Sequence, residues 1–412
     1  MHLDIDNQPL SPPRRPPPGA GGALAPDTDA VDAPPDFPGA ATWDALRRAI
    51  DEALVVQERA FSALADAVAR HRVVSTLPLG SFDHWQRAVG VLAPRRNWLN
   101  PLTRPFDVPD IGLLFRLIRA AREADLVLLT GGERVDLFYA LLLRWLGSVR
   151  TPHIFADAHW SPRRNWLTGW IQRQIHRSAA PKMVEVQPHS EEEVALYARN
   201  FGYRDELIRP IPWSTSLTGH SVEPERGDYV VSGGYSHRDY ATLIAACRDA
   251  PIELRLGIPA RSEVAREARA LARGIPNVQV HRHWSNAEFI DQQARCGVFA
   301  LPITPGLQRS TGDQTILNAM AWGKVVVATD SIGSRVYIRD GENGFLVRES
   351  DPAHWREVLQ RVMTLDETAY TRIGMCAMWD ARVRFGERLR AARTLKAALR
   401  HLDRSDTPGQ AA

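Results

Sequence analysis

The stretch Val298–Val347 reads VFALPITPGLQRSTGDQTILNAMAWGKVVVATDSIGSRVYIRDGENGFLV. It opens with an apolar run, Val298–Ile303, which predicts a buried parallel strand. After a polar loop, Asp313 is expected to cap a helix over 314–322, and 324–328 follows as a second buried strand. This order of strand, loop, helix and strand predicts a right-handed βαβ crossover, and the start of its helix would attract anions.

Apolar runs of strand length alternate with segments of helical spacing on both sides of this stretch. The other expected strands are 72–77, 126–129, 153–158, 183–187, 229–232, 252–256 and 278–281. The region 216–227 is polar and contains Pro and Gly, which predicts a linker. We therefore expect two parallel-sheet α/β domains that face each other across a cleft, with ligands at the C-terminal ends of the strands.

Composition sets limits on the class of protein. The chain has 412 residues, of which 44% are hydrophobic and 24% charged, enough for two domains with separate cores. A net charge of +3 makes no general case for nucleic-acid binding. Cys247, Cys296 and Cys376 are too few and too scattered for a disulfide framework or a zinc site, and fit a reducing cytoplasm. We expect neither a secretory signal nor a membrane span.

The quoted stretch resembles the donor-binding segment of the GT-B glycosyltransferases, in particular the retaining family four (glycosyl transferases group 1). The matching residues are the helix start 312–315, the run NAMAWGK at 318–324, the strand 325–328 and the run DGENGFLV at 340–347. The resemblance implies two Rossmann-like domains. It also implies a loop and helix that hold the diphosphate and ribose of a nucleotide sugar.

With this resemblance, the chain divides at the expected linker. We expect a disordered Pro-rich tail over 1–40, an acceptor-binding N-terminal domain over 41–220 and a donor-binding C-terminal domain over 221–380. A helix over 381–404 would pack back on the N-terminal domain, as in GT-B enzymes, and 405–412 would be a second disordered tail.

One departure from the family concerns two glutamates separated by seven residues, the first touching the sugar and the second gripping the ribose. Ser310 and Asn318 occupy these positions here. Asn318 can still hydrogen-bond a ribose hydroxyl, although without the strength that a carboxylate charge adds. The change weakens the case for catalysis more than the case for binding.

The expected donor site combines the resemblance with the residues themselves. Gly233 and Gly234 end a strand and would let a phosphate approach, unless they form a plain turn. Arg238 matches a basic residue that binds the diphosphate in the family, and Trp284 lies where the family holds the base. The expected donor-binding residues are Gly233, Gly234, Arg238, Trp284, Ser310, Thr311, Gly312, Asp313, Gln314, Thr315 and Asn318.

The expected catalytic residues are His159 and Arg238. His159 matches a family histidine that faces the transferred sugar, and Arg238 would stabilise the charge that develops on the leaving diphosphate without a metal. Asp157 is either a turn carboxylate, which we favour, or an acceptor-side base. His281 and His283 alternate on one strand face, but no further ligand lies nearby, so we expect no metal site.

The middle of the N-terminal domain is basic, with 14 Arg against 7 Asp and Glu between Arg87 and Arg177. Together with Trp166 and Trp170 on a cationic helix, this region could rest on an anionic membrane or receive a lipid-linked acceptor. A solvated arginine face with tryptophans in the core is the alternative.

The sequence therefore favours a cytoplasmic, metal-independent, retaining glycosyltransferase that needs no cofactor. It would move a sugar from a nucleotide diphosphate to a hydroxyl or amine of a small-molecule, glycan or lipid-linked acceptor, with peripheral contact at the inner face of the membrane and no nucleic-acid partner. The alternatives are a catalytically silent nucleotide-sugar-binding or scaffold protein of the same fold, and a nucleotide-sugar epimerase or phosphorylase.

Overall fold

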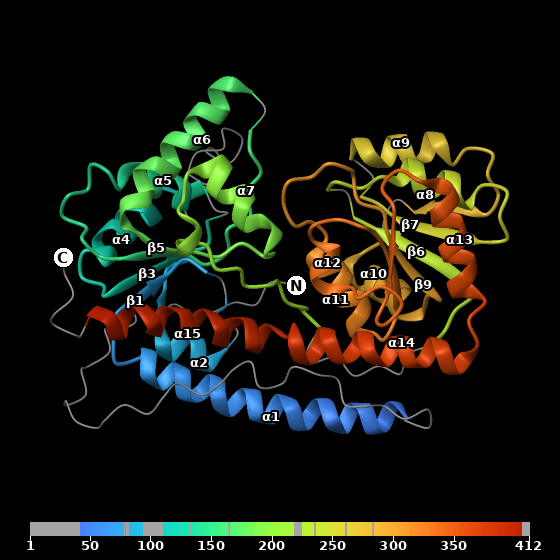
Figure 1. Ribbon diagram of the computed structural model, residues 1–412, viewed down its shortest axis with the longest axis horizontal. Coiled ribbons are helices and arrows are strands. Elements are labelled where there is room, and N and C mark those ends of the chain that lie inside the picture. The colour runs from blue at the N-terminus through green and yellow to red at the C-terminus, as the bar shows by residue number, and fades with distance from the viewer. Residues whose placement is uncertain are drawn as a thin grey trace.

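The computed structural model describes residues 42–405 except 78, 80–81, 94–109, 132–133, 164, 218–224, 235, 260–261 and 282–283. The chain forms two α/β domains, each built on one parallel sheet (Figure 1). The predicted fold class is thereby confirmed. The tails expected over 1–40 and 405–412 lie outside the described residues, apart from Ser405, which ends the last helix.

The N-terminal sheet has five strands in the order β2-β1-β3-β4-β5. The strands are β1 (Val73–Ser75), β2 (Val89–Val91), β3 (Leu126–Leu129), β4 (His153–Phe155) and β5 (Met183–Val186). Every residue of β3 and β4 is buried, because helices cover both faces of this parallel sheet.

Two helical layers enclose this sheet (Figure 1). One layer holds α4 (Ile111–Ala121), α5 (Arg134–Leu142), α6 (Trp166–Ala179) and α7 (Glu192–Phe201). The other holds α1 (Trp43–Val68), α2 (Asp83–Ala88) and α15 (Glu387–Ser405). The first and last described helices of the chain thus share the core of the N-terminal domain.

The C-terminal sheet has six strands in the order β11-β10-β9-β6-β7-β8. The strands are β6 (Tyr229–Gly233), β7 (Glu253–Gly257), β8 (Val278–His281), β9 (Val298–Leu301), β10 (Val325–Thr329) and β11 (Phe345–Val347). This is the doubly wound strand order, and chain direction across the sheet reverses between β6 and β9. Ligands of such sheets bind outside the carboxyl ends of the two strands at that switch point.

Helices also cover both faces of the C-terminal sheet. One face packs against α8 (Tyr240–Cys247), α9 (Glu263–Leu271) and α13 (Pro352–Met363). The other packs against α10 (Asn286–Arg295), α11 (Asp313–Ala321) and α12 (Ser334–Tyr337). The predicted βαβ crossover is β9, α11 and β10, and it lies beside the switch point.

The chain crosses back to the N-terminal domain through α14 (Glu367–Trp379), a π-helical turn over Asp380–Arg384, and α15 (Figure 1). The expected helix over 381–404 was therefore placed too early, since α15 begins only at Glu387. The Asp380 carboxylate accepts hydrogen bonds from Asn343 and Arg339, which holds the turn to the C-terminal domain.

The long helix α1 packs against both domains. Near its start, Leu46 and Ile50 share a buried cluster with residues of α14, and further along, Phe61 and Leu64 pack against α15. The helix is continuous through Val55 and Val56. Val55 is simply on the solvent side of the helix. Among the described residues, no helix is both long and apolar enough to cross a bilayer.

Candidate active site

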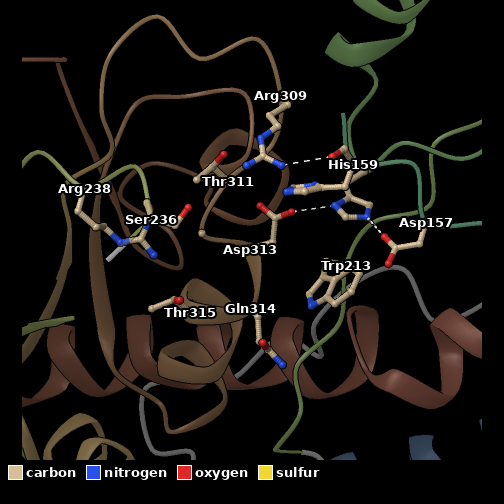
Figure 2. A pocket seen from close by; sticks show the side chains of 12 residues that line it. Asp157, His159, Trp213, Ser236, Arg238, Arg309, Thr311, Asp313, Gln314 and Thr315 are labelled. Atoms are coloured by element: carbon tan, nitrogen blue, oxygen red, sulfur yellow. Dashed lines mark hydrogen bonds and ion pairs between the residues drawn. The ribbon is translucent and has the colours of Figure 1, made fainter. Parts of the chain in front are cut away.

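A cavity of about 580 Å³ lies between the two domains at the carboxyl ends of β6 and β9 (Figure 2). The C-terminal domain lines it with Ser236, Arg238, Arg309 and residues 311–315. The N-terminal domain and the linker after it contribute Asp157, His159, His189 and Trp213. The structure thus brings together seven of the residues expected from sequence: His159, Arg238, Thr311, Gly312, Asp313, Gln314 and Thr315.

The start of α11 forms one wall of the cavity. Gly312 is the N-cap residue and has a φ of 86°, a left-handed conformation that suits glycine. A Cβ on Gly312 would also lie 2.7 Å from Leu301 Cδ2. No side chain caps the helix, so its first amide N–H groups remain available to an anion.

The expectation that Asp313 caps α11 is wrong. Asp313 is the first helical residue, and its carboxylate turns away from the helix amides. Ser310 Oγ donates to Asp313 Oδ1 at 2.6 Å, and His189 Nδ1 contacts Asp313 Oδ2 at 3.0 Å. These two stronger partners explain why the carboxylate leaves the helix start uncapped.

Arg238 approaches the cavity from the loop after β6. Its Nε donates to Gly233 O at 3.2 Å and its Nη1 donates to Ser236 O at 2.8 Å. Gly234 has a φ of 96°, and a Cβ there would lie 3.2 Å from Arg238 Nη2. Burial lowers the pKa of Arg238, but the guanidinium remains cationic at neutral pH. No described carboxylate forms an ion pair with it.

Arg309 is a second cation of the cavity and bridges the two domains. Its Nη1 donates to His159 O at 3.3 Å and its Nη2 donates to His237 Nε2 at 3.3 Å. Its Nε is buried and has no hydrogen-bond partner among the described residues. Burial lowers the pKa of Arg309, whereas the nearby charges of Asp313 and Glu193 act to raise it, and no described carboxylate forms an ion pair with the guanidinium.

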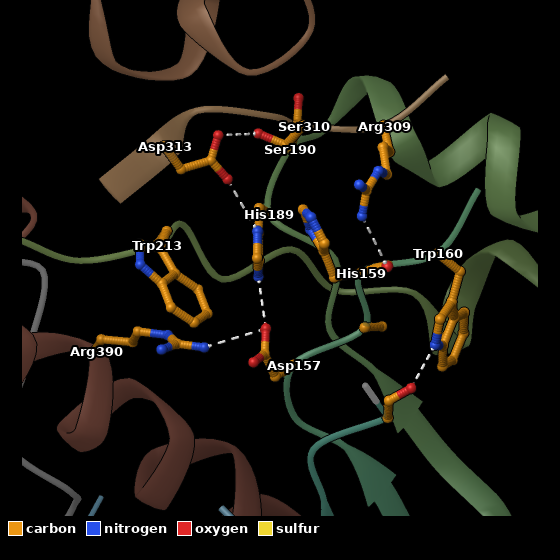
Figure 3. A network of polar contacts seen from close by, with 12 residues as sticks. Asp157, His159, Trp160, His189, Ser190, Trp213, Arg309, Ser310, Asp313 and Arg390 are labelled. Carbon is orange, nitrogen blue, oxygen red and sulfur yellow. Dashed lines mark hydrogen bonds and ion pairs between the residues drawn. The ribbon is translucent and has the colours of Figure 1, made fainter. Parts of the chain in front are cut away.

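A charged network links the domains behind these arginines (Figure 3). His189 Nε2 contacts Asp157 Oδ1 at 2.8 Å, while its Nδ1 contacts Asp313 across the interface. Arg390 Nη2 lies 3.4 Å from Asp157 Oδ1, and the Arg390 guanidinium stacks 3.7 Å above the Trp213 ring. The β4, β5, α11 and α15 segments meet at this network.

The environment of His189 keeps its imidazole protonated. Burial by itself would lower the pKa of His189, but hydrogen bonds and charges from Asp157 and Asp313 raise it to about 9. Burial opposes ionisation of Asp157 and Asp313 as well, yet the bond with His189 holds the pKa of each below its usual range. Two cations, His189 and Arg390, therefore balance the two carboxylates.

His159 lies against this network and is neutral. Its ring stacks on that of His189 with centroids 5.1 Å apart. Burial, followed by the charges of His189 and Arg309, lowers the pKa of His159 to about 4. The ring can therefore hydrogen-bond a ligand at neutral pH but does not supply positive charge.

Glu193 at the start of α7 closes the interface. Its Oε2 accepts from the backbone N–H groups of His189 and Ser190, and its Oε1 accepts from Ser310 N at 3.1 Å. The Ser190 hydroxyl accepts from Glu192 N instead of Glu193 N, so Ser190 and Glu193 form only half of a capping box. Burial raises the pKa of Glu193 to about 7.

Five of the expected donor-binding residues do not line the cavity. Ser310 is buried beneath the start of α11, and Asn318 Oδ1 accepts from Thr215 Oγ1 at 2.8 Å and from Ser216 N at 3.0 Å. Trp284 stacks on the His281 ring, 4.7 Å away, and packs over β7. Gly233 accepts a hydrogen bond from Arg238, and Gly234 lies directly against the Arg238 guanidinium.

Sequence reasoning missed His189, Trp213, Ser236 and Arg309, and it favoured a simple turn role for Asp157. His189 follows β5 directly, as His159 follows β4, and residues just after parallel strands gather at one edge of the sheet. Its place shortly after a parallel strand was therefore the sequence feature that could have identified His189 as a site residue. Trp213 and Arg309 lie in irregular segments, whose placement depends on the contact between domains.

Known proteins with a similar sequence segment or a similar fold include glycosyltransferases. Residues 240–364 match the family model for glycosyl transferases group 1. In sequence, no curated protein matches the chain. HepE from Anabaena, in a structure with UDP-glucose, is similar with a TM-score of 0.55 and 18% identity, over 84% of this chain and 95% of HepE.

Two further structures share the architecture. Sucrose-phosphate synthase from Thermosynechococcus elongatus has a TM-score of 0.57 and 17% identity, over 84% of this chain and 92% of its own. A glycosyltransferase from Rickettsia africae has a TM-score of 0.56 and 11% identity, over 83% and 94%. The resemblance inferred from sequence is thus confirmed: the chain has the fold of the GT-B glycosyltransferases, and residues 240–364 match the model for glycosyl transferases group 1.

Proposed function

We infer that this protein transfers a sugar from a nucleotide diphosphate to an acceptor, and that the donor diphosphate binds at the start of α11. The observation that carries this inference is the uncapped N-terminus of α11 beside Arg238, at the switch point of a doubly wound sheet. Similar folds support it, since one HepE structure holds UDP-glucose and another holds UDP with glucose.

The cavity suits a leaving group that gains negative charge. The acceptor oxygen would form a bond to the anomeric carbon as the bond from that carbon to the phosphate oxygen breaks, and the electron pair would remain on the diphosphate. The acceptor proton would pass to a diphosphate oxygen. Arg238, Arg309 and the α11 amides are fixed donors that stabilise this charge, which is why we propose a metal-independent reaction.

The remaining roles follow from protonation states. His159 is neutral and would hydrogen-bond the transferred sugar, in keeping with its stack on His189. Asp157 is a poor general base because His189 and Arg390 hold its pKa low, so we propose that it positions His189. With no other described carboxylate lining the acceptor side, we also propose retention of anomeric configuration.

The test is calorimetric binding of UDP, GDP and ADP to the wild-type protein and to Arg238→Ala. We expect at least one nucleotide to bind, and the substitution to weaken that binding about 10- to 100-fold, the worth of a charge-assisted contact. Arg248→Ala is the matched control, since Arg248 is exposed at the end of α8 and does not line the cavity. Equal affinity in all three proteins would contradict the proposed site.

A catalytically silent binding protein is the second candidate, and a specific observation favours it. Ser310 and Asn318 replace the two family glutamates, and both are engaged in contacts within the protein. Release of nucleoside diphosphate from the matching nucleotide sugar separates the two candidates: release in the presence of an acceptor indicates transfer, whereas tight binding without release indicates a silent protein.

We further propose a cytoplasmic location, with peripheral contact to an anionic membrane and a small-molecule, glycan or lipid-linked acceptor. The support for the membrane contact is the exposure of Trp166 and Trp170, which the sequence placed on a cationic helix. The alternative expectation, tryptophans of α6 in the core, is not met.

A further inference from the structure

Large hydrophobic side chains are exposed in one region of the N-terminal domain. Ten are exposed among the described residues, and eight of them lie on α4, α5 and α6 or in the turn after α5. These eight, which we call the α4–α6 face, are Ile111, Phe115, Phe138, Trp145, Trp166, Leu167, Trp170 and Ile171. Exposed apolar side chains gathered in this way mark an interaction surface.

The face is most pronounced on α6, which projects from the domain on the side opposite α15 (Figure 1). Trp166 is 77% exposed and Trp170 is 52% exposed. Arg173 and Arg177 follow Trp166 and Trp170 at helical spacing, so the four side chains form one stripe along α6, and both arginines are exposed. Other residues of α6, among them Gly169 and His176, are buried against the domain, whereas the stripe has no partner among the described residues.

On α4, α5 and α6, every exposed charged side chain that the structure describes is an arginine. Neither α4 nor α6 contains an acidic residue, and the one acid of α5, Asp136, is buried and bound to Thr76 and Thr130. Exposed arginines on or beside these helices that pair with no described carboxylate are Arg119, Arg144, Arg163, Arg173 and Arg177. Tryptophan, leucine and isoleucine beside unpaired arginines are the chemistry of a helix at an anionic lipid surface.

A second copy of the chain fits this face less well than a membrane does. A twofold contact through the same patch would bring the arginines of both copies together. Among the described residues, the three helices carry no exposed acid that could offset this repulsion.

The face is also connected to the cavity. The loop after β4 carries Asp157 and His159 into the cavity and leads directly into α6. Gln172 of α6 holds that loop, accepting from Arg163 N at 3.0 Å and donating to Ser161 O at 3.0 Å. A helix lying on a bilayer would therefore place the acceptor side of the cavity near the lipid surface.

We propose that the α4–α6 face docks on an anionic bilayer, with α6 entering the interfacial region, and that the acceptor is lipid-linked. The acceptor part rests on the proposed sugar transfer, whereas the docking does not. Membrane contact then orients the cleft so that an acceptor hydroxyl reaches His159 while its lipid portion stays in the bilayer.

The test is sedimentation of the full chain with vesicles of phosphatidylcholine alone or mixed equally with phosphatidylglycerol. We expect binding only to the mixed vesicles. The double substitution Trp166→Ser, Trp170→Ser should lower the vesicle affinity at least about tenfold. Arg173→Gln with Arg177→Gln should lower it as well and weaken its dependence on salt.

The matched control is Val55→Ser with Val56→Ser, because these two side chains are the remaining exposed hydrophobics and lie on α1. The control should bind vesicles like the wild type. Circular dichroism on each variant shows that it is folded, and calorimetry with the nucleotide that the wild type binds reports on the donor site independently. If the wild-type protein binds a nucleotide but no vesicles, only the docking proposal is overturned. If it binds vesicles but no nucleotide, only the sugar-transfer proposal is overturned.

Two other results would also contradict the docking proposal. One is equal binding to neutral and anionic vesicles that survives the tryptophan substitutions. The other is a concentration-dependent dimer, measured by light scattering, that the tryptophan substitutions abolish while vesicle binding is absent, since the face would then be a contact between copies.

Discussion

Ser310 and Asn318 show how two substitutions can change the role of a motif. Glu193 of the N-terminal domain binds Ser310 N, and Thr215 of the linker binds the Asn318 amide. Ser310 and Asn318 thus both help to hold the C-terminal domain, to which α11 belongs, against the N-terminal domain and the linker. At this scale, the proposed donor site relies on backbone N–H groups and arginines rather than on the two family carboxylates.

Gly312→Ala tests the backbone conformation at the start of α11. We expect the left-handed φ to cost about 1–2 kcal/mol of unfolding free energy in any L-residue, and the overlap with Leu301 to add to it. Denaturant titration measures the loss of stability, and calorimetry should show weaker binding of the nucleotide that the wild type binds. Gly341→Ala is the control, since Gly341 has a φ of 77° but open space around its Cα.

Suppose that Gly312→Ala and Gly341→Ala lower the free energy of unfolding by the same amount and bind the nucleotide as tightly as the wild type does. The close approach of Gly312 to Leu301 would then affect neither stability nor binding. The helix start would then not be the diphosphate site.

Among the elements, α1 decides how the two domains are held. It runs beside α14 and α15: the buried residues of its first half pack against α14, and those of its second half pack against α15. Trp43 at its first turn packs against Gly323 at the end of α11. A helix that precedes both sheets in sequence therefore supports the crossover that carries the candidate site.

Leu46→Ala should destabilise the protein by about 2–5 kcal/mol, because the fully buried side chain leaves a cavity between α1 and α14. Val55→Ala on the solvent side of the same helix should change stability by no more than about 0.5 kcal/mol. Thermal and denaturant unfolding measure both. A neutral Leu46→Ala variant would mean that α1 does not stabilise the C-terminal domain.

At the scale of the whole molecule, His189 joins the domains through a titratable contact. Its pKa of about 9 in the folded protein exceeds the ordinary value of about 6.5, so folding favours the protonated form. The resulting stability is complete below pH 6.5 and is lost as pH rises through 9. The carboxylates of Asp157 and Asp313 would then face each other across the interface without the imidazolium.

We therefore expect the melting temperature to fall between pH 7 and pH 9, by the equivalent of up to about 3 kcal/mol. Glu193 affects stability mainly below this pH range, because its pKa of about 7 means that its effect on the free energy of unfolding changes mostly between pH 4.5 and pH 7. His189→Gln should be less stable at pH 7 and should flatten the slope, whereas His71→Gln, far from the interface, should preserve it. An unchanged slope in His189→Gln would contradict the protonated bridge.

Local chemistry was enough to determine several parts of this protein. Apolar runs of strand length predicted the parallel strands, because residues buried on both faces of a sheet must be apolar. The glycines and polar residues after Val298–Ile303 predicted the crossover and its anion-attracting helix start. Arg238 was expected at the donor site from its place after β6 and from resemblance, and it lines the cavity.

Only the tertiary structure decided the remainder, because it depends on which segments meet. Asp313 looks like a helix cap in sequence, yet His189, 124 residues away, draws its carboxylate across the interface. Asn318 turns to the linker, and Arg309 reaches the His159 carbonyl from the other domain. Each outcome is a competition between a local hydrogen bond and a charged or buried partner that is distant in sequence, and no local pattern records that partner.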